Sequence, residues 1–279
     1  MLTTSDHTPT WTASVTLPSR DLALPDKPSK RETKVDLLCN LPPEILPVTT
    51  YDEIREAFSD PAISAFIFRS REPEVQAAID KLQAAVLSEK RTIELNYCRL
   101  SVDMIGLFLD GHSNNLEFVR DYPHEWEIIR DSLIEGTEFI CSGGRCWDPH
   151  VRCNPWDSNL GSRLHFDKGA ISYIDVLFGP SLYGAVNSDS SKRALTGNVT
   201  LKAGASRFKL PPGCRMILKG EVHPEYKIGG ENPISFNRGN GFLHQTMRPA
   251  NPQSMSAWLK RLSFAAIAAE PPDFAGKHP

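Results

Sequence analysis

Apolar residues recur at helical spacing through the first half of the chain. A helix with one apolar stripe is predicted over 72–88, where the stripe consists of Val75, Ala78, Ile79, Leu82, Ala85 and Val86. A shorter helix is predicted over 51–58, because Thr49 or Thr50 can cap its first turn. Both segments are expected to pack their apolar faces against a core.

Two further helices are expected at about 98–109 and 113–135, the second kinked or split at Pro123, which lacks a main-chain N–H. The apolar run 62–68 is bounded by turn signals and predicts a buried strand. Prolines in 37–48 are expected to prevent regular structure there. Helices whose apolar faces are used in packing support a sheet, so this half is expected to brace the fold and not to carry the chemistry.

After Cys141 the pattern changes to short apolar segments separated by Gly and Pro. Strands are predicted at 163–167, 170–178, 197–201, 206–210, 215–219, 241–244 and 262–268. Several short strands with turn signals between them indicate a β-sandwich or barrel.

The domain organisation follows from these two patterns. Residues 1–35 are rich in Thr, Ser, Pro and charge, with too few apolar residues for a core, and predict a flexible N-terminal arm. Residues 36–279 are then expected to form a single catalytic domain, with a mainly helical part at 36–140 and a β-rich part at 141–279.

Composition does not alter the predicted fold, but it indicates which kinds of partner to expect. Of the 279 residues 40% are hydrophobic, which suffices for a core, and the formal net charge of -3 gives no reason to expect a nucleic-acid partner. No apolar run approaches the length of a membrane span, and Met1–Thr10 lacks the apolar region of a secretory signal. Six cysteines in a chain this long do not make a disulfide scaffold. A cytoplasmic protein with no membrane partner is therefore expected.

Candidate chemistry centres on the segment 161–169. On a strand, residues i and i+2 face the same way, so His165 and Asp167 present an imidazole and a carboxylate side by side. These are two thirds of the 2-His-1-carboxylate facial triad, which binds non-haem iron(II) and leaves positions open for substrate and oxygen. Because His-x-Asp arises often by chance, the prediction depends on a third ligand.

Two downstream histidines can supply that ligand. His244 follows glycines at the end of an apolar strand, where a jelly roll would bring distant strands together, and His223 is its main rival. Further on, Arg261 and Ser263 share one strand face, and a guanidinium beside a hydroxyl suits a carboxylate. Arg248 lies in a predicted loop and is ranked second to Arg261.

This order of His-x-Asp, His and Arg-x-Ser resembles the iron(II)- and 2-oxoglutarate-dependent oxygenases. The resemblance implies an α+β fold with a double-stranded β-helix core, of the jelly-roll or cupin-like kind, braced by N-terminal helices. It implies that His165, Asp167 and His244 bind iron(II). It also implies that Arg261 and Ser263 hold the distal carboxylate of 2-oxoglutarate, although the gap before Arg261 is longer than usual in that superfamily.

A second resemblance is one of motif order, and it covers most of the chain after about residue 45. The segments 45–68, 164–167, 216–221, 241–244 and 261–263 are similar to the family catalogued as domain of unknown function 1826. This resemblance implies no reaction. It does imply that a set of polar residues belongs together, namely His165, Asp167, Lys219, Glu221 and His244.

Other polar residues near these motifs are candidates for contacts with a ligand or substrate. On a strand, Lys219, Glu221 and His223 would face the same way. They would either orient a metal-ligand imidazole or contact the substrate, or else form a surface ion pair of little energetic weight. Arg163 and Lys168, together with Lys219, favour an anionic or carboxylate-bearing substrate.

A separate group of soft ligands lies just after the helical half. Four potential ligands, the number that a tetrahedral zinc site needs, are present: Cys141, Cys146, His150 and Cys153. Their spacing departs from the usual paired Cys-x2-Cys. Free thiols in an ordinary loop are therefore expected.

The function predicted from these residues is a dioxygenase that uses iron(II), 2-oxoglutarate and molecular oxygen. It would oxidise a small molecule by hydroxylation, desaturation or cyclisation. Two other classes stay open. A redox-inert metal at the same ligands would give a hydrolase, lyase or isomerase of cupin-like fold. A non-catalytic metal-binding protein would need neither Arg261 nor an open coordination position.

Overall fold

The computed structural model describes residues 38–272 with interruptions at 89–92, 97–98, 114–116, 142–144, 155–162, 180, 194–196, 223–236, 238, 247–260, 269 and 271. It describes the backbone alone at 87–88, 93–96, 99, 111–113, 117, 145–154, 193, 246 and 261. All described residues belong to one compact unit, 32–279. The predicted arm at 1–35 and the candidate ligand His223 lie outside the described residues.

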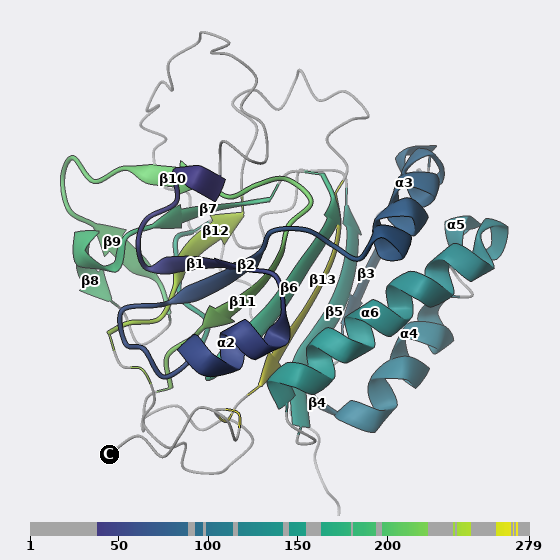
Figure 1. The fold of residues 1–279 in the computed structure, drawn as a ribbon, viewed down its shortest axis with the longest axis horizontal. Coiled ribbons are helices and arrows are strands. Elements are labelled where there is room, and N and C mark those ends of the chain that lie inside the picture. The colour runs from purple at the N-terminus through teal and green to yellow at the C-terminus, as the bar shows by residue number, and fades with distance from the viewer. Residues whose placement is uncertain are drawn as a thin grey trace, which may run out of the picture. The chain divides into compact units, whose positions relative to one another are not determined.

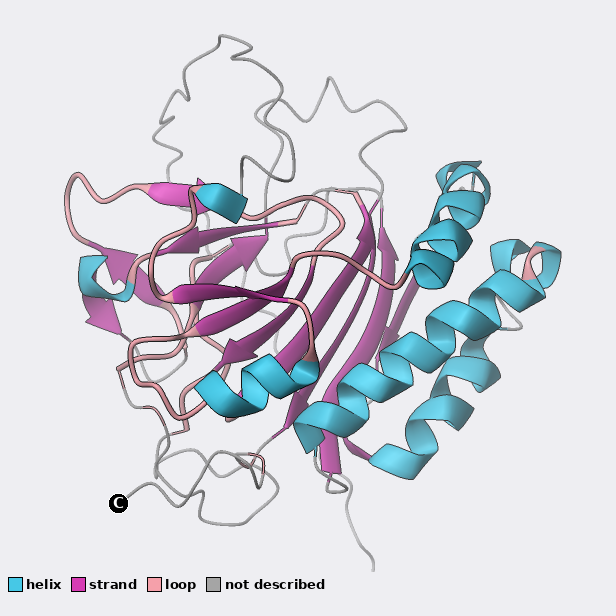
Figure 2. Ribbon diagram, viewed as in Figure 1, coloured by secondary structure: helices cyan, strands magenta, loops and turns pink. Residues whose placement is uncertain are grey.

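A large sheet forms the centre of the described fold (Figures 1 and 2). Its strands are hydrogen-bonded in the order β1-β2-β11-β6-β13-β5-β3, and β4 also pairs with β5. The strands are β1 (Ile45–Val48), β2 (Ala65–Phe68), β3 (Ile93–Asn96), β4 (Arg99–Ser101), β5 (Arg145–Asn154), β6 (Ile171–Phe178), β11 (Arg215–Lys219) and β13 (Arg261–Ala268). The central strand β6 is buried along its whole length, as expected for a strand that is covered on both faces.

Two smaller sheets accompany the large one. One has the order β10-β7-β12, and the other pairs β8 with β9. Their strands are β7 (Leu182–Ala185), β8 (Ser190–Arg193), β9 (Val199–Leu201), β10 (Arg207–Lys209) and β12 (Leu243–Thr246). His165 connects them, because it forms antiparallel bridges with both His244 on β12 and Asn198 beside β9.

Helices cover one face of the large sheet (Figure 2). They are α2 (Tyr51–Ala57), α3 (Pro73–Ser88), α4 (Ile105–Ser113), α5 (Glu117–Asp121) and α6 (Pro123–Cys141), with short 3-10 turns at Val102–Met104 and Asn187–Asp189. Ile79 of α3 and Ile129 of α6 belong to the same buried apolar cluster as Tyr173 of β6 and Phe264 of β13. No helix among the described residues is long and apolar enough to span a membrane.

A second apolar cluster lies on the opposite face of the large sheet. Ile174 and Val176 of β6 contribute to it, as do Leu182 of β7, Phe242 just before β12, and Ala265 of β13. Because successive strand residues point to opposite faces, β6 sends Tyr173 to the helices and its neighbour Ile174 to the small sheet. The described fold is therefore mixed α and β, with several sheets.

Several predicted elements form where the pattern placed them. Thr50 caps α2 by accepting a hydrogen bond from the N–H of Glu53, and Pro123 splits the predicted long helix by beginning α6. The prediction of no regular structure over 37–48 is wrong, because β1 forms despite Pro47. It is an edge strand, where the missing N–H of a proline can be tolerated. The predicted helix at 98–109 begins only at Ile105, after the strand β4.

Charged side chains are buried between the large sheet and the helices. Arg71 donates to Oδ2 of Asp175 at 2.8 Å and to the carbonyl of Val176 at 2.9 Å, and the hydroxyl of Tyr173 donates to the same carboxylate. Asp175 is fully buried on β6. Strand alternation places it on the same face of β6 as Tyr173, which faces the helices.

Candidate metal centre

His165 and His244 are held side by side by the backbone. The N–H of His165 donates to the carbonyl of His244 at 2.9 Å, and the N–H of His244 donates to the carbonyl of His165 at 2.8 Å. Residues that exchange both hydrogen bonds in an antiparallel pair present their side chains on the same face. The two imidazole rings accordingly lie with centroids 4.4 Å apart.

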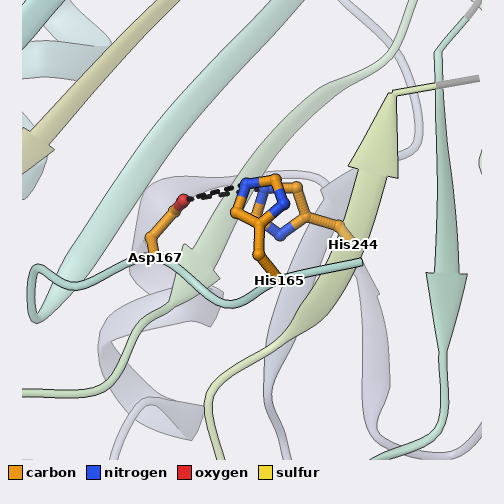
Figure 3. A group of neighbouring side chains, drawn as sticks. All are labelled: His165, Asp167 and His244. Atoms are coloured by element: carbon orange, nitrogen blue, oxygen red, sulfur yellow. Dashed lines mark ion pairs between the residues drawn. The ribbon is translucent and has the colours of Figure 1, made fainter. Parts of the chain in front are cut away.

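Asp167 completes the group (Figure 3). Its Oδ1 lies 3.8 Å from Nε2 of His165 and 3.6 Å from Nε2 of His244. All three ligand atoms lie within 4.8 Å of one another, and this set can hold a metal ion. Ligands roughly 2.1 Å from one ion at right angles would be about 3.0 Å apart, so small side-chain rotations would bring the three atoms to that spacing.

The other ring nitrogen of each histidine faces a main-chain carbonyl. Nδ1 of His165 lies 2.8 Å from the carbonyl of Arg163, and Nδ1 of His244 lies 3.3 Å from the carbonyl of Phe242. A carbonyl only accepts, so each contact requires a proton on Nδ1 and leaves the lone pair on Nε2. This arrangement fixes the tautomer that a metal-binding imidazole needs.

Glu221 links the two segments that carry the ligands. Its N–H donates to the carbonyl of Asp167 at 2.9 Å, and its Oε1 accepts a hydrogen bond from the N–H of Gly241 at 3.0 Å. The carboxylate is fully buried. Glu221 therefore holds the chain that leads into His244 against the loop that carries Asp167.

Lys219 does not lie with Glu221. Its Nζ donates to the carbonyl of Asp60 at 2.7 Å and lies 5.0 Å from the ring centroid of Phe58. Burial lowers the pKa of Lys219 to about 8, and the nearby Asp60 opposes this shift. The side chain braces the segment after α2 on the helix side of the sheet. Its assignment to the group around the metal ligands is wrong.

The remaining predicted site residues lie next to the ligands or on β13. Arg163 and Lys168 are exposed next to the ligands. Ser263 is buried on β13, on the strand face that includes Ala265 of the cluster between the sheets. Arg261 is the first residue of β13, where the structure describes the backbone alone.

The cysteine-rich segment is a strand and not a loop. Cys146, His150 and Cys153 all lie on β5, paired with β13 along most of its length. An extended strand rises about 3.3 Å per residue, so Cys146 and Cys153 stand roughly 23 Å apart and cannot bind one ion. These two cysteines are therefore not ligands of a common ion.

Sequence reasoning missed two neighbours of the histidines. Asn198 is bridged to His165 on the side away from His244. Gly184 of β7 pairs with His244, and the ring of Phe208 lies across it, where a Cβ at Gly184 would come within 2.3 Å of the ring. No motif signals either contact, because both arise from pairing between strands that are distant in the chain.

Comparisons with known proteins find neither a matching family model nor a matching curated protein, so the resemblance to domain of unknown function 1826 is not supported. Solved structures do match. A dioxygenase for auxin oxidation in rice is 13% identical, with a TM-score of 0.42, over 80% of this chain and 78% of that one. A bsmA homolog from Methylobium petroleophilum is 11% identical, with a TM-score of 0.39, over 81% of this chain and 97% of that one.

The Fe(II)/(alpha)ketoglutarate-dependent dioxygenase TqaL is 9% identical, with a TM-score of 0.36, over 80% of this chain and 92% of that one. Similarity at these TM-scores does not establish a common fold or a common activity. Oxygenases therefore occur among the structures that this chain resembles, and the assignment of a function depends on the chain's own residues.

Proposed function

We propose that this protein is an iron(II)- and 2-oxoglutarate-dependent oxygenase acting on a small molecule. The observation that carries the proposal is the convergence of His165, Asp167 and His244 on one point, with both Nε2 atoms turned toward the carboxylate. Two imidazoles and one carboxylate on one side of an ion leave the other side open, which is the arrangement that non-haem iron(II) oxygenases use.

The order of strands supports a double-stranded β-helix core. From β5 onward the chain passes alternately between the large sheet and the small one, except that β7 and β10 both belong to the small sheet and are separated along the chain by β8 and β9. The succession is β5, the His165 segment, β6, β7, the pair β8 and β9, β10, β11, β12 and β13. Two facing sheets wound in this way are typical of a jelly roll, in which metal ligands on the small sheet point into the space between the sheets.

The donor set fits iron(II), and polar groups between the sheets fit a cosubstrate. His165, Asp167 and His244 would hold the metal. Ser263 and Arg261 on β13 are the proposed contacts for the distal carboxylate of 2-oxoglutarate. Ser172 on β6 has a buried hydroxyl with no hydrogen-bond partner among the described residues, on the strand face shared with Ile174. A buried hydroxyl of this kind can receive a polar ligand.

When bound, iron(II) with 2-oxoglutarate and O2 supplies an oxidant for a C–H bond. Hydroxylation would place one oxygen atom of O2 in the product and the other in succinate, with release of carbon dioxide. The chain's own contribution is to hold the reactants and to exclude water. His244 is buried and Asp167 nearly so, whereas the His165 side chain is 28% exposed. Access to the metal is therefore from the His165 side of the group.

The test is anaerobic titration of the Fe(II)-loaded protein with 2-oxoglutarate, followed by the visible charge-transfer band of the bound cosubstrate. His165→Ala should abolish both iron binding and the band. Arg261→Ala should keep the iron and weaken 2-oxoglutarate binding roughly ten- to a hundredfold, the effect of losing a hydrogen bond to a charged group. Arg207→Ala, which removes an exposed arginine of β10, is the matched control and should change neither.

Absence of the band in the wild-type protein would overturn the cosubstrate assignment. Metal binding that depends on His165 and His244 but not on 2-oxoglutarate would then favour a hydrolase, lyase or isomerase with a redox-inert metal.

A further inference from the structure

The strand segment that carries His165 has a second neighbour besides β12. The N–H of Val199 donates to the carbonyl of Leu164 at 2.9 Å, and the N–H of Phe166 donates to the carbonyl of Gly197 at 3.1 Å. These bonds flank His165 and Asn198, which are therefore a non-hydrogen-bonded antiparallel pair, the kind in which side chains approach most closely. Asn198 consequently lies on the face that carries both imidazoles.

The hairpin of β8 and β9 extends this face. Thr200 stands two residues after Asn198 on the same strand and points the same way. Lys192 of β8 is paired directly with Thr200, so it shares that face as well. Asn198, Thr200 and Lys192 thus form a polar row that leads away from His165.

A bulge decides that Lys192 is part of the row. The register shifts by one residue between Ser190 and Lys192, which leaves Ser191 unpaired. The Ser191 hydroxyl donates to the carbonyls of Thr200 at 3.1 Å and Leu201 at 3.2 Å and so stabilises the bulge. In an unbulged hairpin Ser191 would stand opposite Thr200, and the lysine would turn to the other face.

The hairpin is anchored on its other face and at its base. Val199 and Leu201 pack against the buried cluster that includes Leu164 and Phe166. At the base, Nζ of Lys202 donates to the carbonyl of Ser188 at 2.6 Å, and its N–H donates to the carbonyl of Asp189 at 2.7 Å. The row of polar side chains is therefore presented by a fixed backbone.

Exposure increases along the row, away from the metal ligands. His244 is 4% exposed, Asn198 is partly exposed, and Thr200 and Lys192 are exposed. A molecule bound along these side chains would reach the ligand group from the side on which His165 is open.

The charge of this region is positive. Lys192 is the charged residue of the row, and Asp189 is the one acidic residue in segment 188–210. Arg163 is a further exposed cation near the row. It precedes Leu164, whose carbonyl accepts from the N–H of Val199, so it lies beside the Val199–Thr200 segment. An anionic group is thus the chemistry that Lys192 and Thr200 together can bind, by a charge contact and a hydroxyl hydrogen bond.

We infer that the β8–β9 hairpin recognises the substrate, with Lys192 and Thr200 binding its anionic group and Asn198 contacting it nearer the metal. This inference rests on the proposed function and adds the substrate class, a small carboxylate or phosphate. Lys192 is separated from His165 by two interstrand spacings and by two residues along the strand, which places their Cα atoms about 12 Å apart. The anionic group and the reacting carbon are accordingly separated by several bonds.

Three probes test the inference: hexanoate, hexyl phosphate and the neutral methyl hexanoate. Their binding to the full chain is measured by saturation transfer from protein to ligand in NMR, with no metal present. Relaxation of their protons is then measured on Mn(II)-loaded protein with stoichiometric 2-oxoglutarate, which keeps the probes off the ion. Relaxation by Mn(II) reports binding beside the metal centre.

We expect the anions, but not the ester, to bind and to be relaxed by Mn(II), and the tighter of the two anions identifies the substrate group. Lys192→Glu should weaken their binding about tenfold or more. Lys209→Glu is the matched control. It reverses an exposed charge on β10 next to Phe208, which packs against the apolar cluster of Ile174 and Phe242, so Lys209 points to the other face. It should leave binding unchanged.

Three results would each overturn the inference: anion affinity that is unchanged in Lys192→Glu, binding without relaxation by Mn(II), or no binding of either anion. Failure of the proposed function has a different signature. In that case the anions would still bind the metal-free protein and lose affinity in Lys192→Glu, while 2-oxoglutarate would yield no succinate.

Discussion

Gly241 donates its main-chain N–H to the buried carboxylate of Glu221, and a Cβ at Gly241 would lie 2.5 Å from Cγ of that side chain. The contact joins the end of the β11 segment to the residues that lead into His244. Because Glu221 also donates its N–H to Asp167, it joins the two ligand-bearing segments at a second place besides the His165–His244 pair. Glu221 is therefore a positioning residue for the metal site.

Glu221→Ala should weaken Fe(II) binding about ten- to a hundredfold, as is typical when a residue that orients metal ligands is lost. It should also lower the free energy of unfolding by about 1–3 kcal/mol, because the buried N–H of Gly241 loses its acceptor. Glu221→Gln keeps an acceptor oxygen and should restore most of the affinity. Competition with a chromophoric chelator measures the first effect, and urea denaturation measures the second. Wild-type iron affinity in Glu221→Ala would contradict this role.

Gly184 and Phe208 should be energetically coupled. Gly184→Ala would place a methyl group 2.3 Å from the Phe208 ring, and we expect it to destabilise the protein by about 1–3 kcal/mol. Phe208→Ala removes the obstacle, so the double variant should be more stable than the sum of the single effects predicts. A double-mutant cycle in urea measures the coupling. Strict additivity would show that the ring does not fill the space above Gly184.

The pair of Arg71 and Asp175 should be costly to break. Both side chains are almost fully buried, so Arg71→Met leaves a carboxylate without its partner and should destabilise the protein by about 3–5 kcal/mol. Arg71→Met with Asp175→Leu removes both charges and should recover much of this loss. Lys81→Ala, at the exposed end of an ion pair with Glu125, is the control and should change stability by less than about 1 kcal/mol. Urea denaturation compares the four proteins.

Lys219 should make stability depend on pH in the alkaline range. Its pKa is about 8 in the folded protein, against the ordinary lysine value of 10.5, because burial disfavours the charged ammonium. The unfolded chain therefore binds more protons between these values, and the free energy of unfolding should rise with pH across that window.

The rise should reach about 3 kcal/mol relative to a Lys219→Met variant, which lacks the titrating group. Urea denaturation of both proteins at several pH values measures this difference. A difference that stays constant from pH 8 to 10.5, or that favours the variant more as pH rises, would contradict the buried ammonium. Lys209→Met, at an exposed position on β10, should follow the wild type.

The local sequence determined the elements whose formation depends on neighbours in the chain. The 3.6-residue period predicts α3, and Thr50 predicts the start of α2, because helix contacts and caps join residues three or four positions apart. The same locality makes His165 and Asp167 recognisable as adjacent ligands, since two residues is the repeat of an extended strand.

Only the tertiary structure decided which distant residues share a face with these ligands. The pairing of His165 with His244 and with Asn198 depends on strand register, which is set by packing and by turns and not by local propensity. The same register turns Asp175 toward the helices, and the length of β5 emerges only through its partners β3 and β13. Strand pairing is a contact between segments far apart in the chain, so the sequence could list the candidate ligands but not the neighbours that surround them.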